Sequence, residues 1–189
     1  LEALGELVKQ GKVRQIGLSN ETPWGTMKYL ELAETKSLPR VASIQNAYNL
    51  VNRGFEIGLS EVAMHEQVGL LAYSPLAQGT LTGKYLGGQM PQGSRLALFG
   101  DGPLMMRYKG DKTQQAIEMY VNLAKKYEID PAQLAIQFCN IQPFVTSTII
   151  GATTMEQLKT CIDSVDLDIT KEIINEIRSI HKEIPNPAP

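Results

Sequence analysis

The sequence predicts an α/β fold whose parallel sheet is built from repeated strand–helix units. Four short segments, residues 13–19, 41–45, 70–74 and 146–150, are rich in Val, Ile, Leu or Thr and are bounded by turn residues, as buried strands are. Helical patterns lie between them, and the first three segments begin at an even spacing, at residues 13, 41 and 70. Repeated βα units of this kind place their strands side by side and parallel.

Caps and apolar spacing predict the helices. Thr22 before Pro23 and Asp130 before Pro131 each combine an N-cap residue with a proline in the first helical turn. Residues 56–66 form a further helical pattern between the second and third strands. Two apolar stripes are predicted to face the core: Trp24, Met27 and Leu30 in one helix, and Ile173, Ile174, Ile177 and Ile180 in the last.

Three segments depart from this repeat. Residues 79–112 are rich in Gly, Pro, Gln and Met and separate the last two strands, which predicts an inserted lid or binding loop. The proline-rich residues 185–189 are predicted to be a frayed end. The chain opens at Leu1 inside a helical pattern that Gly11 closes, so we expect it to be part of a longer polypeptide.

Four βα units are half of an eight-stranded (β/α)8 TIM barrel, which takes about 250 residues in full. The alternative is a small open sheet. An open dinucleotide-binding sheet would carry a GxGxxG motif after its first strand, and the sequence has none there. We therefore expect residues 1–189 to form one domain, a partial barrel.

Composition excludes several classes of partner. The 18 Lys and Arg residues nearly balance 20 Asp and Glu residues, so neither nucleic acid nor a membrane surface is a predicted partner. No apolar run reaches the roughly 20 residues that span a bilayer. Cys139 and Cys161 lack metal-ligand spacing and are predicted to be reduced thiols of a cytoplasmic protein. His65 and His181 lie on charged helical stretches and are expected at the surface.

The strand ends carry the candidate functional residues, since the site of a βα barrel lies at the carboxyl ends of its strands. These ends are Ser19-Asn20, Gln45-Asn46, Tyr73-Ser74-Pro75 and Gly151-Ala152-Thr153-Thr154. Amides, hydroxyls and an aromatic ring bind a ligand by hydrogen bonds and stacking, and they do not move protons at neutral pH. The ends therefore predict a binding site.

Several of these features also have a plain structural interpretation. The helix after the fourth strand begins with backbone N–H groups that attract a phosphate, but Thr154 and Gln157 also match a capping box. Tyr73 either stacks on a flat ring or plugs the barrel mouth. Lys84 and Arg95, both in the long loop, either clamp a phosphate or are solvated. The residues alone leave these alternatives open.

Taken in order, the strand ends resemble the aldo-keto reductase family over essentially the whole chain. The resemblance is to the fifth to eighth strands of that family's barrel and their helices. It rests on GKVRQIGLSN at residues 11–20, QNAYN at 45–49, LAYSPL at 71–76 with Gly79 and TGKY at 82–85, and IGATTMEQL at 150–158. The Asn20-Glu21-Thr22-Pro23 turn, residues 151–160 and the Pro-Ala-Pro ending most resemble bacterial Tas-type proteins, related to the potassium-channel β-subunit-like branch.

This resemblance implies an NADPH site. Ser19, Asn20 and Gln45 would hold the nicotinamide carboxamide, and Tyr73 would stack on the nicotinamide ring. Other residues would line the rest of the cofactor: Ser74, Leu76, Gly79 and Leu81 the pyrophosphate, Lys84 and Arg95 as a belt over the phosphates, Gly151, Ala152 and Thr153 the adenosine ribose and its 2′-phosphate, and Gln157 the adenosine.

Two departures from the family pattern qualify this expectation. Where the family has Glu-Asn against the adenine, this sequence has Thr160 and Cys161, and a thiol is a poor hydrogen-bond partner, so weaker adenine contacts are expected. The family's catalytic Asp, Tyr, Lys and His belong to its first four strands, which this sequence does not include. Tyr48 and Tyr73 belong to other motifs, so the chain alone is expected to be inactive.

The resemblance thus implies the cofactor-binding half of an NADPH-dependent oxidoreductase that reduces small aldehydes or ketones by hydride transfer. The alternatives are a non-catalytic nicotinamide-cofactor-binding or regulatory module, and a barrel of another metabolic class that shares phosphate-binding loops. Half a barrel exposes two sheet edges, and exposed edges pair with other chains. We therefore expect self-association, aggregation or association with a missing N-terminal half.

Overall fold

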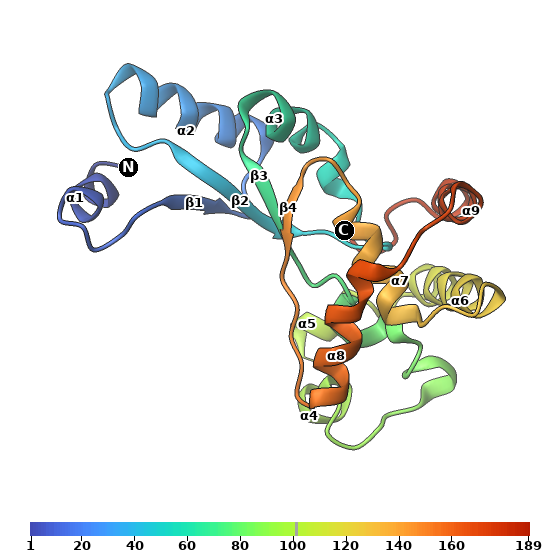
Figure 1. The fold of residues 1–189 in the computed structure, drawn as a ribbon. Coiled ribbons are helices and arrows are strands. Elements are labelled where there is room, and N and C mark those ends of the chain that lie inside the picture. The colour runs from blue at the N-terminus through green and yellow to red at the C-terminus, as the bar shows by residue number, and fades with distance from the viewer. Residues whose placement is uncertain (101) are drawn as a thin grey trace.

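A computed structural model describes residues 1–100 and 102–189 and shows a single parallel sheet (Figure 1). Its strands lie in chain order: β1 (Ile16–Ser19), β2 (Val41–Ala47), β3 (Gly69–Tyr73) and β4 (Val145–Thr148). The predicted parallel α/β fold is confirmed, and four strands in this order are what half of a βα barrel gives. The first strand begins at Ile16 rather than at residue 13, because the ladder with β2 starts at the Ile16–Val41 pair.

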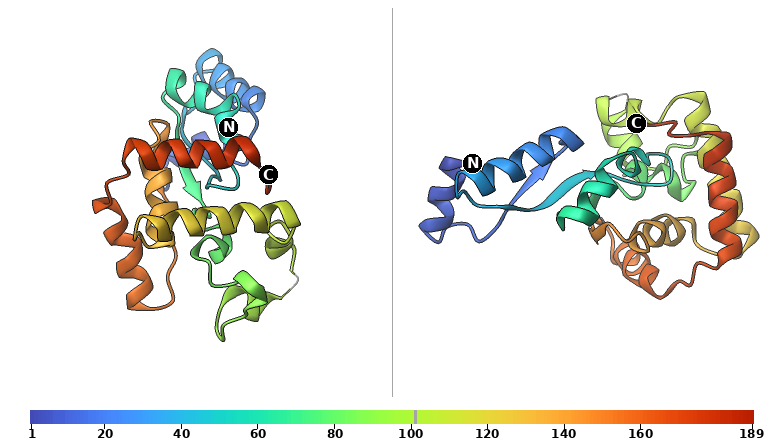
Figure 2. Two further views of the ribbon diagram at one scale, coloured as in Figure 1. Left: turned by 90° about the vertical axis from the view of Figure 1, so that its right-hand side faces the viewer. Right: turned by 90° about the horizontal axis from the view of Figure 1, so that it is seen from above.

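Seven longer helices accompany the described strands. They are α1 (Glu2–Lys9), α2 (Pro23–Thr35), α3 (Leu59–Glu66), α6 (Asp111–Lys126), α7 (Pro131–Asn140), α8 (Met155–Asp163) and α9 (Lys171–Glu183). Short 3₁₀ turns, η1 (Gly54–Glu56) and η4 (Ser164–Asp166), precede α3 and α9. Figure 2 shows α1 and α2 at one end of the molecule and α6 to α9 gathered at the other.

The predicted caps are present. The Thr22 hydroxyl accepts the backbone N–H of Gly25 at 3.0 Å and begins α2. The Asp130 carboxylate accepts the backbone N–H of Ala132 at 2.7 Å and begins α7. These bonds satisfy donors that a helix cannot pair within itself.

One predicted helix face was wrong, and one predicted helix is present but starts later than expected. Trp24 and Met27 are 77% and 42% exposed, because the buried face of α2 runs through Thr26 and Leu30 instead. The helix predicted at residues 56–66 begins only at Leu59, after Gly58.

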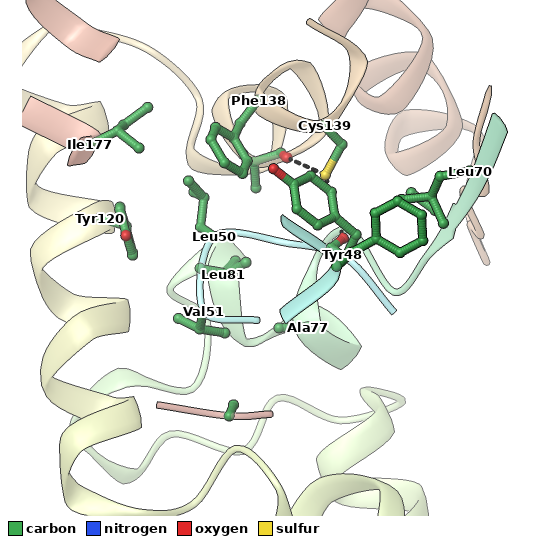
Figure 3. Close-up of a cluster of buried hydrophobic side chains, with 14 of the residues drawn as sticks. Tyr48, Leu50, Val51, Leu70, Ala77, Leu81, Tyr120, Phe138, Cys139 and Ile177 are labelled. Atoms are coloured by element: carbon green, nitrogen blue, oxygen red, sulfur yellow. Dashed lines mark hydrogen bonds between the residues drawn. The ribbon is translucent and has the colours of Figure 1, made fainter. Parts of the chain in front are cut away.

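The core lies between the sheet and α6, α7 and α9 (Figure 3). Tyr48, fully buried, stacks on Phe138 with ring centroids 5.7 Å apart and meets Phe144 edge-on at 5.3 Å. Ile177 of α9 is 1% exposed and Tyr120 of α6 is 3% exposed. Burying each such side chain contributes about 1.5–3 kcal/mol, so this cluster holds the second half of the chain against β2 and β3.

A polar cluster borders this core. Arg53 donates through Nε and Nη2 to the Glu56 carboxylate at 2.7 and 2.8 Å, and the Tyr48 hydroxyl donates to Glu56 at 2.7 Å. His65 is exposed, as predicted, but His181 is half-buried beside this cluster. Burial, followed by the nearby Arg53 charge, lowers the pKa of His181, and its Nδ1 has no hydrogen-bond partner among the described residues.

The long connection between β3 and α6 contains short helical turns: η2 (Ala77–Thr82), η3 (Leu86–Gly88), α4 (Arg95–Phe99) and α5 (Pro103–Met106). Figure 1 shows α4 and α5 on the same side as α8, beyond the carboxyl end of β3. The connection therefore lies where the strand ends open. Within the described parts of the chain, no helix is long and apolar enough to cross a membrane.

The tail prediction was wrong, because residues 185–189 are docked rather than frayed. Ala188 is 1% exposed and donates its backbone N–H to the Val51 carbonyl at 3.1 Å. Thr113 of α6 donates its hydroxyl to the Pro187 carbonyl at 2.7 Å. Figure 2 shows the chain turning back from the end of α9 toward the body of the molecule.

Candidate cofactor-binding site

The strand register brings the predicted strand ends to one edge of the sheet. Ser19 of β1 pairs with Gln45 of β2, and Ala47 of β2 pairs with Tyr73 of β3. Beyond β4, the backbone N–H of Ile149 donates to the Ala72 carbonyl at 2.8 Å. The residues that follow all four strands therefore share this edge, called here the rim.

One end of the rim is a polar cluster formed by β1, β2 and β3. The backbone N–H of Asn20 donates to the Gln45 carbonyl at 3.0 Å, and the Tyr73 hydroxyl donates to the Asn20 side-chain oxygen at 2.8 Å. Ser19, Asn20 and Gln45 are exposed, and Tyr73 is half-buried. Two amides, a hydroxyl and an aromatic ring thus lie together, as the sequence predicts.

Two strand ends turn through left-handed backbone. Asn20 has φ of 55° and Ser74 has φ of 54°. Asparagine tolerates this region and serine does so less well, so the surroundings must hold Ser74 in place. This turn starts the loop that continues into η2.

A chain of side chains runs from β3 to β4 across the long connection. Gln78 donates through Nε2 to the Ser74 hydroxyl at 3.1 Å and accepts a hydrogen bond from Arg95. Arg95 in turn lies beside Gly151, whose Cβ, if present, would be 3.9 Å from Arg95 Nη2. The predicted residues Ser74, Arg95 and Gly151 are therefore brought together, with Gln78 as a link that sequence reasoning missed.

Gly79 and Lys84 form a second contact in this loop. A Cβ on Gly79 would lie 3.1 Å from both Cε and Nζ of Lys84, so the lysine side chain passes directly over the glycine backbone. Gly79 also has φ of 92°, which favours glycine. The Leu76 carbonyl accepts from the N–H groups of Gly79 and Leu81 at 2.8 and 3.2 Å. Leu81, predicted to line the pyrophosphate, is only 1% exposed and belongs to the core, so the structure does not present it at the rim.

The start of α8 forms the helix cap that the structural interpretation of this segment predicts. The Thr154 hydroxyl accepts the N–H of Gln157 at 3.2 Å, and the Gln157 side-chain oxygen accepts the Thr153 N–H at 3.0 Å and its hydroxyl at 3.1 Å. Helix capping is therefore present. Gly151, Ala152, Thr153 and Gln157 are exposed and remain accessible at the rim.

Thr160 and Cys161, which replace the family's Glu-Asn pair, take part in packing. Cys161 is 5% exposed, and burial, followed by the charge of Asp130, raises the pKa of its thiol. The Thr160 carbonyl accepts from Gln133 of α7 at 3.5 Å. Both positions thus contribute to the packing of α8 on α7, and the thiol is not presented to solvent.

Asn49 is a further residue that sequence reasoning did not single out. It is fully buried, its side-chain oxygen accepts the N–H groups of Val51 and Asn52 at 3.0 and 2.9 Å, and its side-chain nitrogen donates to the Ser74 carbonyl at 2.9 Å. Its place in the QNAYN motif marked it only as part of the family resemblance; its bonds to Val51 and Asn52 form a local turn, and its bond to Ser74 depends on the pairing of β2 with β3.

The chemistry of the rim is that of a binding surface. Hydroxyls, amides and a tyrosine ring lie at one end, Arg95 lies beside Gly151 after β4, and Lys84 lies over Gly79 in the loop after β3. Among the described residues, no group of three His, Cys, Asp or Glu side chains is placed to hold a metal ion. Tyr48 is fully buried, and burial, reinforced by Glu56, raises the pKa of its hydroxyl, so it cannot supply a proton to the rim.

Comparison with known proteins agrees with the motifs. The model of the aldo/keto reductase family matches residues 1–182. Protein tas of Escherichia coli (strain K12) is 51% identical over 189 residues, covering 100% of this chain and 54% of its own length. The L-glyceraldehyde 3-phosphate reductase of the same strain is 33% identical over 167 residues, covering 87% of this chain and 48% of its own length.

A third relative belongs to the potassium-channel β-subunit-like branch that the sequence resembles. A probable voltage-gated potassium channel subunit beta of Arabidopsis thaliana is 34% identical over 120 residues, covering 62% of this chain and 37% of its own length. The chain spans about half the length of the first two relatives. With its parallel βα units and its rim of strand-end motifs, the chain belongs to the aldo/keto reductase family, an oxidoreductase family with a (β/α)8 barrel.

Proposed function

We propose that this chain is the cofactor-binding half of an NADPH-dependent aldo-keto reductase acting on small aldehydes or ketones. The observation that carries the proposal is the contact chain from Ser74 through Gln78 and Arg95 to Gly151. It joins the ends of β3 and β4 with a cation from the long connection. Separate segments thus form one surface of the kind that an extended dinucleotide needs.

The residues present fit such a cofactor. Gly79 provides a backbone cradle that a Cβ would fill, and Lys84 Nζ lies against it. At the other end of the rim, the buried side-chain oxygen of Asn46 has no hydrogen-bond partner among the described residues. Polar groups suited to a carboxamide therefore lie near Tyr73, and two cations suited to phosphates lie in the long loop, Arg95 beside Gly151 and Lys84 over Gly79.

Each part of the rim has a distinct role in this proposal. Ser19, Asn20 and Gln45 would hold the nicotinamide carboxamide, and the Tyr73 ring would cover the nicotinamide face. Backbone atoms of the β3 loop would follow the pyrophosphate, and Lys84 and Arg95 would neutralise the phosphates. Gly151, Ala152, Thr153 and Gln157 would lie along the adenosine. When bound, the nicotinamide supplies the hydride that reduces a carbonyl.

The chain alone is proposed to bind the cofactor but not to reduce a carbonyl substrate. The rim residues position a cofactor, and neither Tyr48 nor Tyr73 is placed as a proton donor: Tyr48 is buried, and the Tyr73 hydroxyl donates to Asn20. A non-catalytic nicotinamide-binding module is the second candidate, since the rim would serve it equally well. Reduction would then require the other half of the barrel.

The test is a binding titration beside an activity assay. We expect the purified chain to bind NADPH, measured by quenching or shift of nicotinamide fluorescence, and to show no NADPH oxidation with a model aldehyde. Absence of binding under conditions where circular dichroism shows a folded chain would contradict the proposed function. Steady NADPH oxidation by the purified chain would contradict the assignment of the catalytic groups to the other half.

The open sheet supports a proposal about partners. Within the described residues, β1 and β4 are edge strands, and Ile149 beyond β4 is 40% exposed. Open strand edges pair with other strands. We propose that the chain self-associates, or associates with an N-terminal half, and expect light scattering during size-exclusion chromatography to show dimers or larger species. A monodisperse monomer that unfolds cooperatively would contradict this.

A further inference from the structure

We propose that residues 186–188 act as a strap that positions the phosphate side of the rim, through the turn at residues 49–52. The link consists of side-chain and backbone hydrogen bonds that connect the docked tail with Ser74. The proposal rests on the proposed function for the identity of the ligand. The mechanical link itself is defined by contacts and can be tested without a ligand.

The first step is the docking of the strap. The Asn186 side-chain oxygen accepts the backbone N–H of Arg53 at 2.8 Å, and Ala188 donates to the Val51 carbonyl at 3.1 Å. Thr113 of α6 holds the strap from the other side through the Pro187 carbonyl at 2.7 Å. Prolines restrict the free segment, so docking orders fewer conformations than it would for a flexible tail.

The second step is the turn that the strap covers. Asn49 and Asn52 exchange backbone hydrogen bonds at 3.0 and 3.1 Å, and the Asn49 side-chain oxygen accepts from Val51 and Asn52. The strap therefore contacts Val51, whose N–H helps to fix the Asn49 side chain, and Arg53, which follows Asn52. Loosening Val51 frees one of the two N–H groups that orient this amide, and loosening Arg53 frees the residue next to Asn52, which carries the other.

The third step reaches the rim. Asn49 donates through Nδ2 to the Ser74 carbonyl at 2.9 Å, and the same carbonyl accepts the Ala77 N–H at 2.9 Å. Ser74 has a left-handed φ of 54°, and a non-glycine residue keeps this conformation only where its surroundings hold it. The Ser74 hydroxyl then meets Gln78, which Arg95 contacts. Strap and rim are thus joined by an uninterrupted series of named bonds.

The test variant is Asn186→Gly, which removes the side-chain acceptor while accommodating the positive φ of 43° at this position. Asn186→Asp keeps an oxygen acceptor and is the conservative rescue. Asn122→Gly, at an exposed position of α6, controls for a glycine introduced elsewhere. Thr113→Val removes the hydrogen bond between Thr113 and the Pro187 carbonyl, and it replaces Asn186→Gly as the test variant if Asn186→Gly does not fold.

Amide hydrogen exchange is measured first, without cofactor. We expect Asn186→Gly to speed exchange at Val51 and Arg53 and also at Ala77 by about fivefold, the effect of losing one hydrogen bond. Asn186→Asp and Asn122→Gly should match the wild-type chain at Ala77, and the Ile177 amide in α9 should be unchanged in all. Faster exchange confined to residues 49–53 and 186–188, with Ala77 unchanged, would overturn the proposal.

NADPH affinity is the second readout. If the wild-type chain binds NADPH, Asn186→Gly should weaken binding about fivefold and Asn186→Asp should restore it. An NADPH affinity that is unchanged in Asn186→Gly would contradict a role of the strap in binding. If the wild-type chain does not bind NADPH, the proposed function fails, and the exchange experiment alone decides whether the strap positions the rim.

Discussion

Replacing Arg53 with methionine is expected to lower the free energy of unfolding by about 3 kcal/mol at neutral pH. The side chains of Arg53 and Glu56 are only 13% and 29% exposed, and their shortest N–O distance is 2.7 Å. Methionine removes the positive charge but leaves Glu56 partly buried, with Tyr48 as its remaining hydrogen-bond donor. An uncompensated buried carboxylate is costly, so the loss exceeds that of a surface pair. Chemical denaturation followed by circular dichroism measures it.

The matched control is Lys126→Met, which removes an ion pair with Glu176 whose side chains are 60% and 38% exposed. Solvent screens this pair, so its removal should lower the free energy of unfolding much less than Arg53→Met does. Equal losses in Arg53→Met and Lys126→Met would refute the importance of burial at Arg53.

The stability lost in Arg53→Met should depend on pH, and the pKa of Glu56 gives the direction. Burial raises the pKa of Glu56, but hydrogen bonds from Arg53 and Tyr48 outweigh it and hold the pKa below its ordinary value of 4.5. A group whose pKa is lower in the folded state stabilises the fold above pH 4.5. The fold loses this stabilisation as the pH falls from 4.5 through the lowered pKa. The difference in free energy of unfolding between the wild-type chain and Arg53→Met should therefore become smaller well below pH 4.5, where Glu56 is protonated. A gap that widens in acid would contradict the assignment.

Replacing Arg95 with alanine is expected to weaken NADPH binding by about tenfold, as loss of a hydrogen bond between charged groups does at an exposed site. Arg95 lies between Gln78 and Gly151, so its guanidinium is held at the β4 end of the rim. NADPH and NADH differ by the 2′-phosphate, and NADH affinity should fall by less. Fluorescence titrations with both cofactors, at low and high salt, measure the effect, which salt should diminish.

Arg14→Ala is the control for this change. Arg14 is exposed and precedes β1, at the edge of the sheet opposite the rim, so both cofactor affinities should stay unchanged. An equal loss for NADPH and NADH in Arg95→Ala would show that Arg95 acts on the shared pyrophosphate instead of the 2′-phosphate. No loss for either cofactor would remove Arg95 from the site.

Much of the fold followed from local chemistry. Thr22 and Asp130 marked the starts of α2 and α7 because each combines a favoured N-cap side chain with a proline in the first helical turn, followed by apolar residues at helical spacing. The four strands were recognisable because short runs rich in Val, Ile, Leu or Thr between turns suit a buried parallel sheet. The convergence of Ser19 with Gln45 followed from parallel pairing, which brings strand ends to one edge.

Tertiary structure decided what local pattern could not. Trp24 and Met27 were misplaced because apolar spacing gives a helix face but not what covers it, and α2 buries Thr26 instead. The tail was misjudged because its order comes from Val51 and Thr113, residues distant in sequence.

The sequence by itself determined the family, the order of the βα units and the chemical character of the rim, because motifs and periodicity are local properties of the chain. Only the tertiary structure decided that Gln78 links Ser74 to Arg95 and that Asn49 joins the docked tail to the rim. These contacts depend on strand register and on where a loop returns, and a hydrogen bond of about 3 Å between distant segments leaves no mark in the order of the residues.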